Sequence, residues 1–288
     1  MVDDETKARV SSGARSKESS ENHQLRLHRP LPNQEKSIQT SCNLNKLAIR
    51  TKERDFGAKE YDKYNPWFWI DVETSGLRPE HSQILEMAIV VTDSNLVVWD
   101  SLSIVLHHPA MTLMTNSSQW CKRHFRSRSH GGNGLFDDCN FSTTTKEEAS
   151  RLIWNFFEYY SSHEIGKGRP RPMHRQFFDK TLGANGANLT NFDLSSSPYS
   201  TRRPHHQVIL AGSTVHFDRK FLEFHFPFLT RFISHKNVDV TTLLETVKRF
   251  RSGLLSNKPK PAAKHRAMPD ILDSIELLRY FRKEIIEK

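Results

Sequence analysis

The stretch PWFWIDVETSGLRPEHSQILEMAIVVTD, residues 66–93, is the part of this 288-residue chain that says most about its fold. Residues 66–73 form an aromatic and β-branched run of strand length that ends in two acidic positions. Residues 83–93 form a second, more continuous apolar run, and Gly76 and Pro79 between the two runs indicate a turn. The chain is therefore expected to begin its folded part with two neighbouring strands.

The elements that follow alternate between strand and helix patterns. Strands are recognised by short apolar runs between turn residues, and helices by apolar residues at three- and four-residue spacing. In chain order the expected elements are a strand at 95–106, a helix at 145–163, a strand at 207–212, a helix at 218–226, a strand at 237–240 and helices at 241–251 and 270–286. This order predicts an α/β fold with a mixed five-stranded sheet flanked by helices.

Two segments lack such patterns and divide the chain. Residues 1–64 are dominated by Ser, Lys, Glu, Arg, Asn and Gln, which predicts a disordered N-terminal extension. Residues 163–206 also carry no persistent period, and we expect them to be a disordered insertion. The mean hydropathy of −0.63 is low for a fully packed globule. It favours one domain, residues 65–288, with disordered additions rather than two domains.

The charge distribution points to a polyanionic partner. The net charge is +9, which suits a nucleic acid but is not specific for one. Residues 65–162 hold 7 basic and 11 acidic side chains, whereas residues 208–288 hold 15 basic and 9 acidic ones. A negative pocket with a positive rim would suit a substrate with a phosphate backbone.

The cysteines and the N-terminus bear on the compartment. Cys42, Cys121 and Cys139 show no CxxC spacing, which argues against a disulfide framework or a zinc site and favours an intracellular location. Acidic residues near the N-terminus argue against a mitochondrial transit peptide, while Arg9, Arg15 and several serines favour one. The choice between mitochondrion and cytoplasm or nucleus therefore stays open. No apolar run approaches the ~18 residues that a membrane span needs, so we expect no membrane association.

Carboxylates at the ends of these elements carry the chemistry. Asp71 and Glu73 share one face of the first strand because they are two residues apart. Asp218 and Asp270 each fall at the start of a predicted helix. Converging carboxylates repel one another unless cations lie between them, and hard oxygen ligands favour Mg²⁺ or Mn²⁺. With His265 as a nearby base, the set predicts a two-metal phosphodiesterase.

Each of these residues also has an ordinary structural explanation. Asp71 and Glu73 could end a strand at the surface, and Asp218 could cap a helix. Asp270 could interact with a helix dipole, and His265 could be an exposed loop histidine. The five residues together, rather than any one of them, favour a functional site.

The three motifs D-x-E, an Asp in a Gly-rich turn, and H-x-A-M-x-D resemble the DEDDh pattern of 3′→5′ exonucleases. Within that superfamily the chain is most similar to oligoribonuclease, and the similarity covers residues 65–164 and 207–288. The stretches that carry it are WIDVETSGLRPEHSQILEMAIVVTDSNL, SQWCKRH, NVDVTTLLE and HRAMPDILDSIELLRYFR. The resemblance implies a ribonuclease-H-like fold, a homodimer, and degradation of short single-stranded RNA from its 3′ end to nucleoside 5′-monophosphates.

The resemblance also assigns catalytic roles. It implies that Asp71, Glu73, Asp218 and Asp270 hold two Mg²⁺ or Mn²⁺ ions, and that His265 takes the proton from the attacking water. All five positions match the family motif. Catalysis is therefore expected.

The resemblance further assigns substrate contacts. Leu77 matches a wedge that stacks on the terminal bases, and His235 stands where the family usually has a stacking Tyr. Thr214, Lys236 and Thr241 match positions that cap the 5′ phosphate of a dinucleotide, some of them from the partner protomer. The family usually has Ser, Arg and Ser at these cap positions. Lys keeps the charge but loses the bidentate geometry of Arg, so the strictness of the dinucleotide preference stays open.

Two other functions remain to be distinguished from this one. The chain could be a broader DEDDh exonuclease that acts on longer RNA or on DNA, or an inactive nucleic-acid-binding scaffold of the same fold. Comparing the hydrolysis of a dinucleotide with that of a long single strand distinguishes a broader exonuclease from an enzyme that degrades short RNA. Metal binding without hydrolysis of any nucleic acid would favour the second.

Overall fold

The computed structural model describes residues 66–162, 206–262 and 265–287. The predicted N-terminal extension at 1–64 lies outside the described residues, and so does all but the last residue of the predicted insertion at 163–206. Disorder in these two segments therefore stays a prediction.

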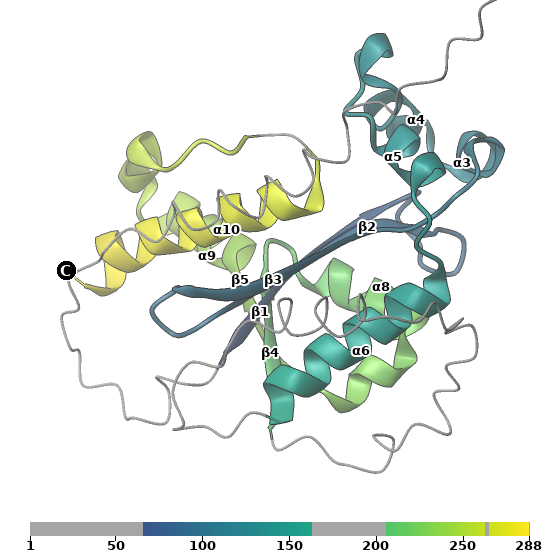
Figure 1. Cartoon of the computed structure of the whole chain (residues 1–288). Coiled ribbons are helices and arrows are strands. Elements are labelled where there is room, and N and C mark those ends of the chain that lie inside the picture. The colour runs from purple at the N-terminus through teal and green to yellow at the C-terminus, as the bar shows by residue number, and fades with distance from the viewer. Residues whose placement is uncertain (1–65, 163–205, 263–264, 288) are drawn as a thin grey trace, which may run out of the picture. The chain divides into compact units, whose positions relative to one another are not determined.

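Five strands form one mixed sheet in the order β3-β2-β1-β4-β5. β1 pairs antiparallel with β2 and parallel with β4, while β2–β3 is antiparallel and β4–β5 is parallel. The strands are β1 Trp67–Thr74, β2 Ile84–Thr92, β3 Val98–Val105, β4 Val208–Gly212 and β5 Ile233–Asp239. The predicted α/β fold with a mixed five-stranded sheet flanked by helices is confirmed (Figure 1).

Helices cover both faces of the sheet, with α6 and α8 on one face and α9 and α10 on the other (Figure 1). The α-helices are α3 Ala110–Asn116, α4 Gln119–His124, α5 Leu135–Phe141, α6 Lys146–Ser162, α8 His216–His225, α9 Val240–Phe250 and α10 Ala267–Phe281. Shorter turns are the 3₁₀ segments η2 Arg128–His130, η3 Pro227–Arg231 and η4 Ser252–Asn257, and the π turn η5 Arg282–Ile286. Among the described residues, no helix combines the length and the apolar character needed to cross a bilayer.

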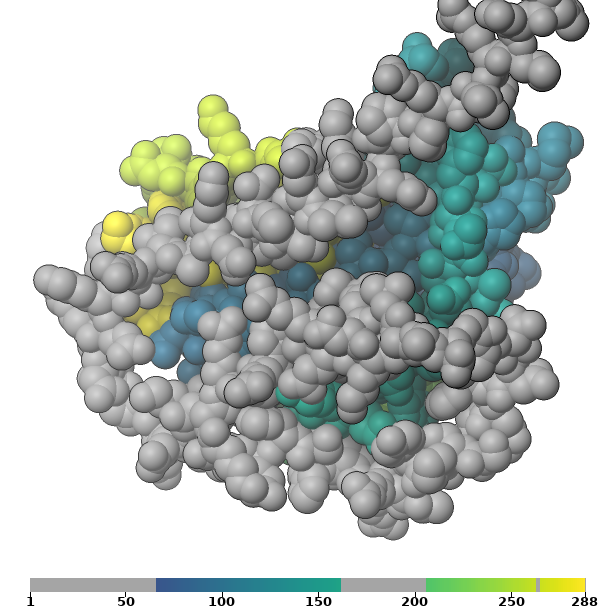
Figure 2. Space-filling view, in the orientation of Figure 1, coloured from purple at the N-terminus to yellow at the C-terminus, as the bar shows by residue number. Residues whose placement is uncertain are grey.

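The alternation of side chains along β1 decides which face carries the chemistry. Phe68 is fully buried in the aromatic core beneath α6, with its ring centroid 4.8 Å from that of Phe157. Trp69 points to the other face, where it belongs to the same buried cluster as Ile271 of α10. Because side chains alternate along a strand, the acidic positions 71 and 73 share the face of Trp69 and lie under α10. In the space-filling view, the blue atoms of the first strands lie between the yellow α10 and the teal helices (Figure 2).

The sequence patterns did not predict the three short helices between β3 and α6. α3, α4 and α5 contain six or seven residues each, too few for a sustained helical period. They are held instead by a separate buried cluster that includes Leu85, Phe125 and Leu135. The fifth strand also differs from the prediction, because it begins at Ile233 rather than 237.

The two described cysteines belong to that short-helix cluster and form no disulfide. The Cys121 thiol donates to the Thr74 carbonyl oxygen at 3.3 Å, and the Cys139 thiol lies 3.6 Å from the Leu85 carbonyl oxygen. Both thiols therefore help to attach the short helices to the ends of β1 and β2. Cys42 lies outside the described residues.

Candidate active site

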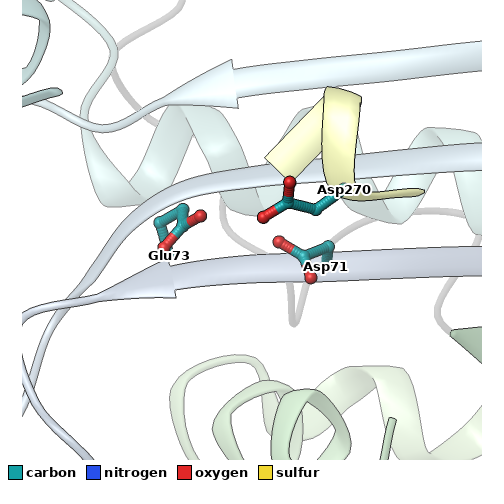
Figure 3. Close-up of side chains that lie close together, drawn as sticks. All are labelled: Asp71, Glu73 and Asp270. Atoms are coloured by element: carbon teal, nitrogen blue, oxygen red, sulfur yellow. The ribbon is translucent and has the colours of Figure 1, made fainter. Parts of the chain in front are cut away.

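Three of the predicted site carboxylates meet above the end of β1. Asp71 and Glu73 rise from the strand, and Asp270 points down to them from the first turn of α10 (Figure 3). One carboxylate oxygen from each of the three lies within 4.8 Å of the others. Residues separated by almost two hundred positions are thus brought to one point by the packing of α10 on the sheet.

Asp218 reaches the same strand from the opposite side. It lies in the first turn of α8, is 4% exposed, and its Oδ1 accepts a hydrogen bond from the Val72 N–H at 2.9 Å. β4 ends at Gly212, so β1 runs past it and leaves this N–H without a strand partner. A Cβ at Gly212 would lie 2.8 Å from the Ile70 carbonyl oxygen, so the close approach of the two chains requires glycine. Asp218 lies outside the group of three oxygens.

The four carboxyls are strongly perturbed by burial and by one another. Burial, together with the neighbouring Asp270 and Glu86, raises the pKa of Glu73 to about 8. Burial and then Asp218 and Glu73 hold the pKa of Asp71 well above its usual range.

Burial is also the main cause of the raised pKa values of Asp218 and Asp270. Burial raises the pKa of Asp218 to about 7, although the Val72 N–H partly offsets the shift. Burial and then Asp273 raise the pKa of Asp270 to about 6. An acidic centre that resists ionisation gains stability from bound cations, so this donor set fits divalent metal ions.

A fifth carboxylate, Glu86, lies directly opposite Glu73 in the β1–β2 register, but it is compensated. Arg266 donates to both of its oxygens, from Nε at 2.8 Å and from Nη2 at 3.1 Å. The same guanidinium donates from Nη1 to Asp138 at 2.7 Å, and the Ala267 N–H donates to Glu86 at 3.3 Å. Arg266 therefore fixes the start of α10 to β2 and α5.

His265 is held in place directly before this anchor. Its φ of +46° lies in the left-handed region, which is costly for a residue with a side chain. Its carbonyl oxygen accepts a hydrogen bond from Asn133 Nδ2 at 2.7 Å. Its ring makes edge contacts with Trp120 and His124, at centroid distances of 5.1 and 5.8 Å. The imidazole is thus positioned by an aromatic pair on α4 and by the Arg266 anchor.

Trp120 and His124 were missed as individual site residues by the sequence reasoning. Their rings are stacked at 3.9 Å with an interplanar angle of 17°, and Trp120 is 41% exposed beside His265. The signal that could have found them is a Trp and a His at i, i+4 spacing, which shares one helix face. The helix itself was not predicted, so the spacing had no structural context.

Two of the predicted cap residues lie together at the start of α9. Thr214 has a φ of +58°, and its hydroxyl donates to the Thr241 hydroxyl at 3.2 Å. The Asp239 carboxylate accepts from the N–H groups of Thr214 and Thr241, at 3.1 and 2.9 Å. These three residues line an open hollow that also includes His216.

The remaining predicted substrate residues lie elsewhere on the surface. His235 and Lys236 are exposed on β5 and do not line that hollow. Leu77 is 82% exposed in the turn after β1, next to the carboxylate cluster in sequence. Within this chain, the structure does not join His235 and Lys236 to the Thr214–Thr241 pair.

Known proteins show where this arrangement belongs. The chain is 31% identical over 219 residues to an oligoribonuclease of Thiobacillus denitrificans, an alignment that covers 76% of this chain and 93% of the relative. It is 30% identical over 221 residues to the mitochondrial oligoribonuclease of Mus musculus, covering 76% and 73%. It is 29% identical over 224 residues to the oligoribonuclease of Chromobacterium violaceum, an alignment that covers 77% of this chain and 97% of the relative.

Other comparisons are less informative. No family model matches the chain. The solved structure of E. coli exonuclease I with single-stranded DNA aligns with 77% of this chain at 11% identity and a TM-score of 0.48, and the chain spans 42% of that protein. On the identity and coverage of the sequence relatives, the chain belongs to the oligoribonuclease family.

Proposed function

We propose that this chain is a metal-dependent exoribonuclease that removes nucleotides from the 3′ end of short single-stranded RNA. The observation that carries the proposal is the convergence of Asp71, Glu73 and Asp270 within 4.8 Å, in a member of the oligoribonuclease family. Carboxyls with raised pKa values in such a cluster are typical of a functional site rather than of a structural one.

The acidic residues would hold two divalent cations, Mg²⁺ or Mn²⁺. Asp71, Glu73 and Asp270 offer oxygens from one side, and Asp218 offers its second oxygen from the other, since Oδ1 is occupied by Val72. When bound, such ions promote ionisation of an attacking water and neutralise the charge on the leaving 3′ oxygen. The hard carboxylate donors favour these two metals, since among the described residues the cluster includes no sulfur or imidazole ligand.

His265 would accept the proton of the attacking water. A neutral imidazole can do this near physiological pH, and general base catalysis of this kind contributes about 10²–10⁴-fold to the rate. The edge contacts with Trp120 and the Asn133 hydrogen bond restrict the ring and the backbone of His265. A base that is already oriented loses little entropy when substrate binds.

The exposed residues would bind the RNA ends. Leu77 projects from the turn after β1 and would stack on the terminal bases, a contact that tolerates any sequence. Thr214 and Thr241 would present their hydroxyls to a phosphate. His235 and Lys236 lie apart from them on the edge strand β5, which fits a contribution to the site of a second copy in a homodimer.

A time course on 5′-labelled RNAs of two to twenty nucleotides tests the proposal. With Mn²⁺ or Mg²⁺ we expect shortening from the 3′ end with nucleoside 5′-monophosphates as products, and no reaction in chelator. Products with 3′ phosphates, or equal rates in chelator, contradict it. Light scattering of the purified chain measures the dimer separately.

The compartment stays a prediction. The relatives from Mus musculus, Bos taurus and Homo sapiens are named mitochondrial, whereas the bacterial ones are not. Imaging of the tagged full chain in its own cells decides between mitochondrion and cytoplasm or nucleus.

A further inference from the structure

A basic segment lies beside His265, and its charged side chains have no part in the function proposed above. The block 65–162 contains more acidic than basic residues, yet no acidic residue occurs between Asp100 and Asp137. Four of the seven basic residues of this block fall within seven positions, namely Lys122, Arg123, Arg126 and Arg128. We call residues 122–134 the basic turn.

The basic turn is attached to the candidate base by direct contacts. Asn133 Nδ2 donates to the His265 carbonyl oxygen at 2.7 Å. The Asn133 N–H donates to the His124 carbonyl oxygen at 2.8 Å, and the His124 ring contacts the His265 ring. The turn therefore has a fixed position relative to the reacting end of the site.

Glycines make the turn compact and hold its arginines. The Gly134 N–H donates to the Arg126 carbonyl oxygen at 2.9 Å. A Cβ at Gly132 would lie 2.1 Å from that same oxygen, so only glycine fits there. Gly134 has a φ of +82°, and a Cβ on it would lie 2.8 Å from the guanidinium carbon of Arg128. Two arginines are thus packed against a rigid backbone rather than carried on a free loop.

The positive charges of the turn are largely uncompensated. Arg123, Arg126 and Arg128 are exposed, and within the described residues neither Arg123 nor Arg126 forms an ion pair. Arg128 is 63% exposed and has one weak contact of 3.5 Å with Asp138. Asp138 is bound more closely by Arg266, at 2.7 Å.

We propose that the basic turn binds the phosphate backbone of single-stranded RNA longer than a dinucleotide while the 3′ end of that RNA lies at the carboxylate cluster. The inference rests on the function proposed above and defines its substrate class more closely. Guanidinium groups form paired hydrogen bonds with phosphate oxygens. Backbone contacts carry no sequence information, which suits an enzyme that removes any nucleotide.

The test compares a dinucleotide with a hexanucleotide RNA in a variant that carries Arg123→Gln, Arg126→Gln and Arg128→Gln. A matched control carries Arg251→Gln, Lys260→Gln and Lys283→Gln, which removes the same charge from exposed positions outside the turn. Circular dichroism and thermal melting check that each variant folds. A single Arg123→Gln variant provides a test if the triple variant does not fold, because Arg123 has no ion pair to lose within the described residues.

We expect the triple variant to raise KM for the hexanucleotide about tenfold or more in 50 mM salt, and to change KM for the dinucleotide less than about twofold. Each lost phosphate contact should lower the salt dependence on a single strand by about 0.7 in log–log slope. When the salt is raised from 50 to 200 mM, the affinity of the wild type should therefore fall about twentyfold more than that of a variant that has lost three contacts. The control triple should keep the wild-type slope.

Two results overturn the inference. One is an unchanged KM and salt slope for the hexanucleotide, and the other is an equal rise in KM for both RNA lengths or for the control triple. Fluorescence anisotropy of the hexanucleotide in chelator measures the same contacts without catalysis. If the wild type binds the hexanucleotide through the turn but hydrolyses nothing, the proposed function fails, whereas phosphate binding by the turn is supported.

Discussion

Glu73 and Glu86 face each other across β1 and β2, and they differ in what surrounds them. Glu86 receives a bidentate guanidinium from Arg266 and a backbone N–H, so its charge is compensated within the chain. Glu73 has the carboxyls of Asp71 and Asp270 beside it, and its pKa is raised to about 8. Two glutamates at one register position thus have opposite electrostatic environments.

The two environments suggest a structural role for Glu86 and fit the catalytic role proposed for Glu73. A buried carboxylate with its own arginine contributes to the fold, since removing either partner leaves an unpaired charge. A buried carboxylate without one weakens the fold until a cation is supplied from outside. Substitutions at the two positions should therefore have opposite effects on stability.

The largest effect on turnover should follow from removing the charge of one proposed metal ligand. We expect Asp218→Asn to lower turnover on the order of 10³-fold or more, because the electrostatic stabilisation it supplies cannot be replaced. The amide oxygen can still accept the Val72 N–H, so the melting temperature in chelator should not fall. Retention of wild-type turnover would remove Asp218 from the site.

Removing the base should have a smaller effect of a different kind. His265→Ala is expected to lower kcat by about 10²–10⁴-fold while leaving metal affinity close to that of the wild type. Isothermal titration with Mn²⁺ and single-turnover rates measure the two quantities. A parallel loss of metal affinity would show that His265 acts on the carboxylates rather than on water.

Breaking the compensated pair should destabilise the protein. Arg266→Ala leaves the charges of Glu86 and Asp138 without their shared partner, at a cost of about 3–5 kcal/mol in the free energy of unfolding. Lys248→Ala is the control, since Lys248 pairs with Glu245 on the exposed surface of α9. Exposed pairs of that kind contribute about 0–1 kcal/mol. Urea unfolding measures the free energy of unfolding of both variants. Equal losses would contradict a structural role for the pairing of Arg266 with Glu86.

The smallest effect concerns pH. The raised pKa values of Glu73, Asp218 and Asp270, about 8, 7 and 6, mean that the folded state keeps protons which the unfolded chain releases near pH 4. In chelator, stability should therefore be highest at low pH with respect to these groups, and should fall as the pH rises from about 4 to about 8. Glu73→Gln should flatten the profile.

Divalent cations should reverse this trend. At a hundredfold excess over Kd, a bound ion adds about 2.7 kcal/mol, or about 5–10 °C in melting temperature. Differential scanning fluorimetry across pH, with and without Mn²⁺, measures both effects. A melting temperature that rises with pH in chelator would contradict the assignment of the raised pKa values.

The sequence predicted the long elements of this fold because their periodicity is strong. The helix expected at 145–163 is α6 Lys146–Ser162, and Thr145 caps it by accepting the Glu148 N–H at 3.2 Å. It did not predict α3, α4 and α5, whose stability comes from tertiary contacts rather than from a local pattern.

The same limit applies to the site. Three short motifs in the sequence carry the five catalytic candidates, which is why a local pattern could propose them. Arg266 and Glu86 were not found, because they are 180 positions apart and their pairing depends on how α10 packs on β2. A local pattern reveals the type of a side chain but not its distant partner.

The ends of the chain that border residues 163–205 lie next to each other. The His206 N–H donates to the Ser161 carbonyl oxygen at 3.3 Å, so α6 finishes where the approach to β4 begins. A connection of a few residues could therefore join the end of α6 to the start of β4. Replacing the intervening segment with a short glycine–serine linker, about a tenth of its length, should lower the entropy cost of closing that connection by about 2 kcal/mol. We therefore expect this position to tolerate a change in the length of the connection, because Ser161 and His206 already lie within hydrogen-bond distance.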